Sequence, residues 1–192
     1  MAHRSGGGSA VRGTALSYDL RPATLTDLPM LRAWKRGAHV AQWWGADDPF
    51  DETDLATPGF QPWILSWAGR DFAYLQDYDP GIEAGHHFGH LPAGSRGMDQ
   101  FIGPEDMLGQ GHGTAVVARH VAFLFSLGVP VVALDPHPEN ARAIRVYEKA
   151  GFRVAGSAQE TRWGLVLPMI VERQTLSEQA GDQDSPSRFI RR

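Results

Sequence analysis

Residues 108–115 read LGQGHGTA, with three glycines in five positions directly before an apolar run that begins at Ala115. A helix that starts here would present free N–H groups and the positive end of its dipole, and glycines would let the loop backbone approach an anion closely. The segment therefore predicts either a phosphate-binding loop or a tight structural turn, and its neighbours must decide between the two.

Two familiar phosphate-binding loops do not match this segment. It lacks the Gly-Lys-Ser/Thr ending of a P-loop. The spacing of Gly109, Gly111 and Gly113 lacks the last glycine of the dinucleotide-binding fingerprint, and the loop lies in the middle of the chain rather than opening a βαβ unit. A phosphate site here would therefore belong to another class.

An acid lies shortly before the glycine loop. Residues 98–102, MDQFI, predict a short central strand, on which Asp99 and Phe101 share one face because side chains alternate. A carboxylate there can hold a substrate ammonium group and accept its proton, directly or through water. The alternative is a solvated aspartate at the end of a strand.

The histidines of residues 86–90 favour no metal chemistry. His86 and His90 have the spacing of two metal ligands on a helix, but Gly85, Gly89 and Pro92 disfavour a helix and no glutamate lies between the pair. We expect exposed loop histidines and no metal site, with a zinc hydrolase as the minor alternative.

The composition is that of a single globular domain. The 192 residues are 42% hydrophobic and 21% charged, which is enough for one full core. There are no cysteines, which excludes disulfides and thiolate chemistry, and the net charge of −4 gives no reason to expect nucleic-acid binding. Without a membrane-spanning stretch or signal peptide, we expect a cytoplasmic domain over residues 17–175, a flexible leader over 1–16 and a flexible tail over 176–192.

Hydrophobic periodicity and turn residues predict an α+β (mixed α/β) fold with a mixed sheet of six to seven strands and about four helices. Thr26 is expected to cap the first helix, and the five acids of residues 47–54 are expected to form a solvated loop. Residues 114–127 predict a buried helix, and Asn140 and Gly151 flank another. Residues 152–155 and 163–167 are expected to be the closing strands.

The stretch from the glycine loop to Phe152 carries a family signature. It resembles the GNAT superfamily of acyl-CoA N-acyltransferases, whose motif Q/R-x-x-G-x-G/A is followed by N-x-x-A-x-x-x-Y-x-x-x-G-F. The matching residues are Gly111, Gly113, Asn140, Ala143, Tyr147, Gly151 and Phe152. Leu108 departs from the first position of the glycine motif. Residues 96–103 and 40–44 also look similar to the aminoglycoside 6′-N-acetyltransferases within that superfamily.

This resemblance implies a site for acetyl-CoA, with coenzyme A as product. The cofactor-binding residues it implies are Phe101, Ile102, Gly109, Gln110, Gly111, His112, Gly113, Thr114 and Asn140. It also implies that Asp99 and Tyr147 are catalytic, as acceptor and donor of a proton respectively. A core tyrosine and a simple helix cap remain the alternative roles of Tyr147 and Asn140.

The expected acceptor is a primary amine of a small polycationic molecule such as an aminoglycoside. Candidate residues that would bind it are Trp43, Trp44, Gln76, Asp77, Asp79, Asp99, Asp135 and the acids of 47–54. Core tryptophans, a turn aspartate and solubilising acids are the alternatives. A siderophore-type hydroxylysine, a protein amine and a non-catalytic acyl-CoA-binding module also stay open, as do monomeric and homodimeric states.

Overall fold

The computed structural model describes residues 18–45 and 50–173, so the expected leader and tail lie outside the described residues. A seven-stranded mixed sheet runs through the domain in the order β1-β2-β3-β4-β5-β9-β6, and β7 and β8 form a separate hairpin. The expected fold class and strand number are confirmed. The strands are β1 (Tyr18–Pro22), β2 (Phe60–Trp67), β3 (Arg70–Tyr78), β4 (Arg96–Ile102), β5 (Val131–Leu134), β6 (Arg153–Val154), β7 (Gln159–Thr161), β8 (Gly164–Val166) and β9 (Met169–Glu172).

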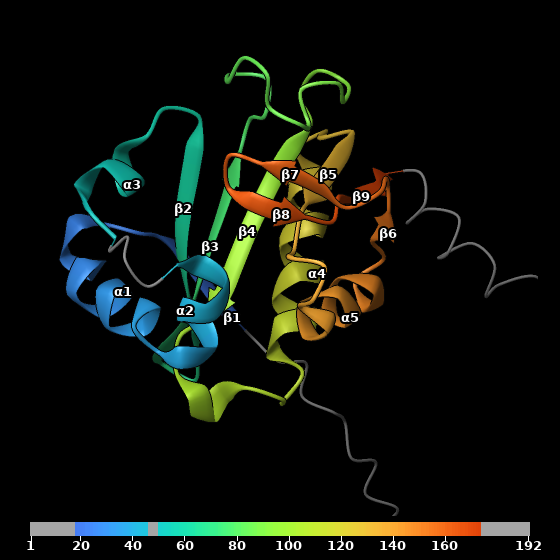
Figure 1. Cartoon of the computed structure of the whole chain (residues 1–192). Coiled ribbons are helices and arrows are strands. Elements are labelled where there is room, and N and C mark those ends of the chain that lie inside the picture. Colours follow the sequence, from blue (N-terminus) through green and yellow to red (C-terminus); the bar gives the residue numbers. More distant parts are fainter. Residues whose placement is uncertain (1–17, 46–49, 174–192) are drawn as a thin grey trace, which may run out of the picture.

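Helices cover both faces of this sheet. Figure 1 shows α1 and α2 on one side of the strands and α4 and α5 on the other. The α-helices are α1 (Leu28–Lys35), α2 (Ala38–Trp44), α3 (Glu52–Ala56), α4 (His112–Ser126) and α5 (Ala141–Lys149), and two 3₁₀ turns span Leu25–Asp27 and Glu105–Met107.

The two faces have separate cores because strand side chains alternate. Leu75 and Val132 pack with Val117 and Leu124 of α4 in the larger cluster. Tyr74 of β3 points to the other face, into the cluster that α1 and α2 cover. On the face that α1 and α2 cover, the side chain of Phe88 packs against Val131, Ala133 and Ile170. The segment 79–95 that carries Phe88 contains no helix or strand.

The helix starts differ from expectation at two places. Thr26 is not the cap of α1: Asp27 accepts hydrogen bonds from the Thr24 N–H (2.8 Å) and hydroxyl (3.0 Å), so a capping box forms one turn earlier. The acidic segment 47–54 is not all loop, since Asp51 accepts from the N–H groups of Thr53 and Asp54 and starts α3. Carboxylates stabilise a helix N-terminus, which is why this acidic run can be helical. Residues 46–49 lie outside the described residues.

The closing strands also differ from expectation. Residues 153–154 join the sheet as β6, but the expected strand 163–167 becomes β8 and pairs only with β7. The position beside β5 is taken by β9, which pairs with Val131–Leu134 in antiparallel register. Because β9 follows β8 after two residues, the sequence pattern did not separate a surface hairpin from the strand that completes the sheet.

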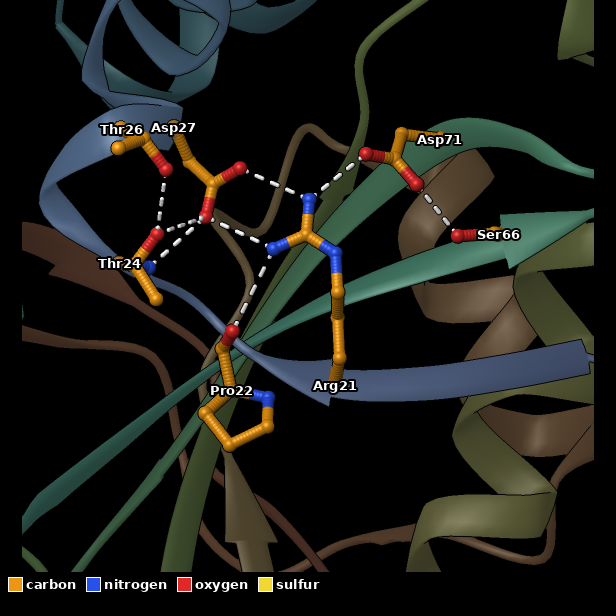
Figure 2. A network of polar contacts seen from close by, with 7 residues as sticks. All are labelled: Arg21, Pro22, Thr24, Thr26, Asp27, Ser66 and Asp71. Atoms are coloured by element: carbon orange, nitrogen blue, oxygen red, sulfur yellow. Dashed lines mark hydrogen bonds and ion pairs between the residues drawn. The ribbon is translucent and has the colours of Figure 1, made fainter.

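One buried acid ties the start of the chain to the β2–β3 hairpin (Figure 2). Arg21 donates to both oxygens of Asp27 at 2.8 Å and to Asp71 at 2.7 Å, and the Ser66 hydroxyl donates to Asp71. The Arg21 hydrogen bonds, with those of Thr24, lower the pKa of Asp27 to about 2. The corner between β1 and α1 is therefore fixed by charge-assisted hydrogen bonds.

The Asp27 contact predicts an acid-dependent loss of stability. The folded-state pKa lies below the unfolded value, so the contribution is complete above about pH 4 and disappears as pH falls towards 2. We expect Asp27→Asn to lower the free energy of unfolding by about 2 kcal/mol at pH 7 and by much less at pH 2. Urea titrations at both pH values test this, with the exposed Asp19→Asn as control. An equal loss at both pH values would contradict the assignment.

Candidate active site

The site begins where two central strands part. Parallel pairing between β4 and β5 is confined to Arg96 with Val132 and Gly97 with Ala133. Beyond these residues β4 continues for five residues, 98–102, with no β5 partner, so a gap opens in the middle of the sheet. A cofactor arm needs such a separation between the strands in order to enter the sheet.

The free edge of β4 presents main-chain groups to this gap. The Gly103 N–H bonds to Phe72 of β3 at 2.8 Å, so alternation along β4 directs the Phe101 main chain to β3 and those of Gln100 and Ile102 to the gap. The Ile102 carbonyl oxygen contacts Nε2 of His39 at 3.0 Å. The N–H groups of Gln100 and Ile102 are therefore placed to pair with an extended ligand, whereas that of Phe101 is not.

A cleft of about 1300 Å³ passes through this gap. Its volume exceeds the range of roughly 300–1,000 Å³ that is usual for one drug-sized ligand. The glycine loop and α5 line one end, and α2, β3 and the segment 79–95 line the other. The cleft has room for two molecules that approach each other from opposite faces of the sheet.

The glycine loop forms the N-terminal end of α4. Gly109 and Gly111 have φ values of 76° and 87°, which other residues rarely adopt, and Gly111 is the N-cap. Ala115 is the residue whose N–H bonds back to the Gly111 carbonyl (3.2 Å), so the N–H groups of the first turn before it have no acceptor within the helix. The loop therefore fits an anion through its main chain.

The predicted loop residues do not all face the cleft. Gly109, Gly111, Gly113 and Thr114 line it. The Gln110 side chain instead donates to the Asp106 carbonyl oxygen at 2.6 Å. The His112 side chain is buried beneath the loop, with Nδ1 2.8 Å from the Tyr18 hydroxyl. Gln110 and His112 are thus limited to main-chain contacts with a ligand.

Helix α5 brings two signature residues to the same gap. Asn140 caps the helix by accepting from the Ala143 N–H at 3.0 Å, and it also lines the cleft. Tyr147 is 7% exposed and lies between the larger core and the cleft. Burial raises the pKa of its hydroxyl above the ordinary value, so the group stays protonated and is available as a donor.

Asp99 lies at the other end, on the face of α1 and α2. Its carboxylate accepts from the Gln76 side-chain amide at 2.8 Å, and Gln76 in turn accepts from the Tyr74 hydroxyl at 2.8 Å. Burial raises the pKa of Asp99 to about 7, and the negative charge of Asp135 adds to this shift. A carboxylate with this pKa exchanges protons at physiological pH, as a general base must.

Asp135 lies close by because it follows the last residue of β5 on the same face. Its Oδ2 is 2.8 Å from Nε2 of His87, a residue of the segment 79–95. Tyr78 completes this end of the cleft, and its ring lies against Gly97, where a Cβ atom would be only 2.2 Å from it. Two carboxylates, an imidazole and an aromatic ring thus converge where an amine would enter.

The two tryptophans of α2 have different surroundings. Trp44 packs on Phe101, with ring centroids 4.9 Å apart, and belongs partly to the second core. Trp43 lies 5.5 Å from the His137 ring, which follows β5, so this contact joins α2 to the β5–α5 segment. Both tryptophans line the cleft.

Asp77 is separated from the other candidates. It is one residue from Gln76 and therefore points to the opposite face, where Nε2 of His120 is 2.9 Å and Arg96 is 2.7 Å from its carboxylate. Burial alone would raise the pKa of Asp77, but hydrogen bonds from His120 and Trp63 lower it below its ordinary value. Asp77 lies in a buried ion-pair network beneath the sheet.

Three contributors were missed in the sequence. The role of the Gln100 main chain can be deduced only when the register of β4 against β3 is known, although the position of Gln100 next to Asp99 was a usable signal. His87 was expected to be an exposed loop residue, yet its side chain is 7% exposed. Trp163 reaches the cleft from the β7–β8 hairpin and contacts the His86 ring at a centroid distance of 4.9 Å. No local pattern places that hairpin over the cleft.

Within 18–45 and 50–173, no group of three or more His, Asp or Glu side chains is arranged to hold a metal ion. No helix in that part of the chain has the length and apolarity needed to cross a membrane.

The split central strands, the glycine loop before α4 and the cleft between them define an acyl-CoA-type N-acyltransferase fold. The chain belongs to the GNAT acetyltransferases, because the family model described as an acetyltransferase (GNAT) domain matches residues 23–159. This confirms the family resemblance found in the glycine loop and α5.

Relatives of known activity extend this assignment. The chain is 34% identical over 178 residues to aminoglycoside N(6′)-acetyltransferase type 1 of Klebsiella pneumoniae, which covers 86% of this chain and 88% of the relative. A structure of AAC(6′)-Ib with coenzyme A and kanamycin superimposes with a TM-score of 0.78 at 34% identity, over 86% of this chain and 100% of that one. The lysine N-acyltransferase MbtK of Mycobacterium tuberculosis is 28% identical over 158 residues, 78% of this chain and 75% of its own.

The backbone of the glycine loop predicts a specific binding defect. Gly111→Ala forces a Cβ into left-handed geometry at a cost of roughly 1–2 kcal/mol, so the first turn of α4 should shift. We expect acetyl-CoA affinity, measured by calorimetry, to fall about tenfold.

Gly128→Ala is the matched control for this substitution. Gly128 also has a positive φ, 93°, and follows the other end of α4, and open space surrounds both Cβ positions. It should lose similar stability and keep its affinity. Unchanged affinity in Gly111→Ala, or equal losses in both variants, would contradict a role for this loop in binding.

Proposed function

We propose that this chain transfers an acetyl group from acetyl-CoA to a primary amine of an aminoglycoside. The observation that supports this most directly is the cleft through the sheet, which leads from the open N-terminus of α4 to Asp99 and Asp135. The named relatives support the choice of acceptor, since one is an aminoglycoside acetyltransferase and another was solved with kanamycin.

The cofactor end is formed by main-chain groups. The N–H groups of residues 109–114 would hold the pyrophosphate, and the gap edge of β4 would pair with the pantetheine arm as an added strand does. The N–H of Gln100 or Ile102 would donate to the thioester carbonyl oxygen as negative charge develops there. Bound acetyl-CoA supplies the activated acetyl group.

Two side chains would move the protons. Asp99 accepts a proton from the substrate ammonium, which leaves a neutral amine to attack the thioester carbon. The C–N bond forms as the C–S bond breaks, and the Tyr147 hydroxyl gives its proton to the departing thiolate. Tyr147 regains a proton from the nitrogen, so the net products are an amide, the free thiol and one proton.

We propose that the protein works in the cytoplasm, where acetyl-CoA is available, as a monomer or homodimer. The cleft supports either state, because all the residues argued to bind or react come from one chain.

A thiol-release assay tests the function. With acetyl-CoA and kanamycin we expect release of coenzyme A and a product that has gained one acetyl group. The absence of cysteine from the chain means that a thiol reagent reports only the coenzyme. Release with lysine-type amines alone would assign a different acceptor. Acetyl-CoA binding without release for any amine would leave a binding module instead of an enzyme.

Asp99 predicts the pH dependence of turnover. Because its carboxyl must be ionised to accept a proton and its pKa is about 7, kcat/KM should fall below about pH 7. Asp99→Asn should lower kcat by between about 100-fold and 10,000-fold and remove this acidic limb, with acetyl-CoA affinity kept. It should not reduce stability at pH 8, since the raised pKa shows that the buried charge is unfavourable.

Glu139→Gln is the matched control, because it removes an exposed carboxylate from the rim of the same cleft. We expect its pH profile to match that of the wild type. An unchanged kcat in Asp99→Asn would remove Asp99 from the role of proton acceptor.

A further inference from the structure

The segment 79–95 places one imidazole directly on the acceptor end of the cleft. Nε2 of His87 is 2.8 Å from Oδ2 of Asp135, and the two side chains are 7% and 14% exposed. Both ring nitrogens of His87 are buried, and neither has a hydrogen-bond partner among the described residues, so the short contact with Asp135 lacks hydrogen-bond geometry. Both residues line the cleft.

Both partners are held by rigid surroundings. Phe88, next to His87, is 2% exposed and packs against Val131 and Ala133 of β5, while Asp135 directly follows β5. The His87 ring stacks on His86 with centroids 4.5 Å apart, and Trp163 packs on His86 from the β7–β8 hairpin. Because these contacts fix loop and strand together, the imidazole–carboxylate contact is built into the fold.

The pair stands beside a second acid with no such partner. Asp99 and Asp135 interact electrostatically, and the hydrogen bond of Asp99 comes from the uncharged amide of Gln76. Two like charges in a poorly solvated cleft disfavour ionisation of both. An imidazole in contact with one of the two carboxylates makes their surroundings unequal, and the positive charge of His87 acts against the upward shift of the Asp99 pKa.

We propose that His87 is a positioning residue that divides the roles of the two acceptor-end carboxylates. By contacting Asp135 it holds that carboxylate in place for an ammonium of the acceptor, and it leaves Asp99 as the carboxylate that exchanges a proton with the reacting amine. The proposal rests on the proposed acetyl transfer for its kinetic consequence, whereas its effect on Asp99 needs no acceptor.

Other titratable and charged groups face this trio from the surrounding elements. They are Tyr74 and Tyr78 of β3, Tyr147 of α5, Glu83 and His86 of the segment 79–95, and Arg162 of the β7–β8 hairpin. Burial raises the pKa of the three tyrosines, which therefore stay neutral. Glu83 and Arg162 form an ion pair with each other. Among the described residues, His87 is thus the basic side chain that directly contacts one of these carboxylates, Asp135.

The first test follows the Asp99 carboxyl group by ¹³C NMR without acceptor, assigned by its loss in Asp99→Asn. His87→Gln removes the charge and keeps a polar side chain, so the Asp99 midpoint should rise by about one pH unit. Asp135→Asn should lower it, because the repelling charge is gone. The variants act on opposite partners of the pair, so a folding failure in one leaves the other decisive.

The second test is the acidic limb of kcat/KM, with the aminoglycoside as acceptor. The limb should move to higher pH in His87→Gln and to lower pH in Asp135→Asn. In the double variant it should lie between the limbs of the two single variants, because the His87 charge also acts on Asp99 directly. His90→Gln is the matched control, since His90 is an exposed neighbour whose Nδ1 contacts only the His87 carbonyl oxygen and whose side chain does not line the cleft.

The outcomes separate this inference from the proposed function. An Asp99 midpoint that stays in place in both His87→Gln and Asp135→Asn overturns the role of His87, whatever acceptor is acetylated. Failure of kanamycin to react, with the NMR shifts as expected, overturns the proposed acceptor and leaves the division of roles intact.

Discussion

Parallel pairing between β4 and β5 ends after two residues, and the site depends on this early separation. The strands part at Leu134, which still belongs to β5 and pairs with β9 alone, and β5 then ends before Asp135 and Pro136, since a proline has no N–H for a ladder. The departing chain is then held by the hydrogen bond from the Leu167 N–H to the Pro136 carbonyl oxygen, 2.8 Å long. A free strand edge in the centre of a sheet is normally a liability. Here it lines a cleft and is the surface that an extended cofactor arm fits.

The same separation lets groups from opposite faces of the sheet work on one reaction. Tyr147 belongs to the core beneath α4 and α5, whereas Asp99 lies on the side of α1 and α2. In a continuous sheet such side chains would be isolated from each other by the backbone. Asp77 illustrates this separation: one residue away from Gln76, it points to the α4 face, and there its carboxylate contacts Arg96 and His120.

Local chemistry made the fold class and much of the site predictable. The glycine loop, the Asn140 cap and the central strand with Asp99 are encoded in neighbouring residues, and their predicted elements are confirmed. The prediction of Thr26 as a cap failed because Thr24 and Asp27 form a capping box one turn earlier. The prediction that 163–167 closes the sheet failed because a hairpin and an inner strand have similar patterns. His87 could not be placed, because Phe88 positions it through contacts with β5, far away in sequence.

Few carboxylates in this cleft are available to bind a polycation, and their low solvation compensates for their small number. Glu83 is the one acid of residues 80–96, and its ion pair with Arg162 ties it to the hairpin. Asp79, Asp99 and Asp135 remain in the lining of the cleft, and Asp99 and Asp135 are poorly solvated. A charge pair formed in such a place is stronger than one at an exposed surface, since less water screens it. Recognition would then depend on where two ammonium groups lie relative to these carboxylates, with aromatic rings such as Trp43 and Tyr78 beside them, more than on the total charge of the substrate.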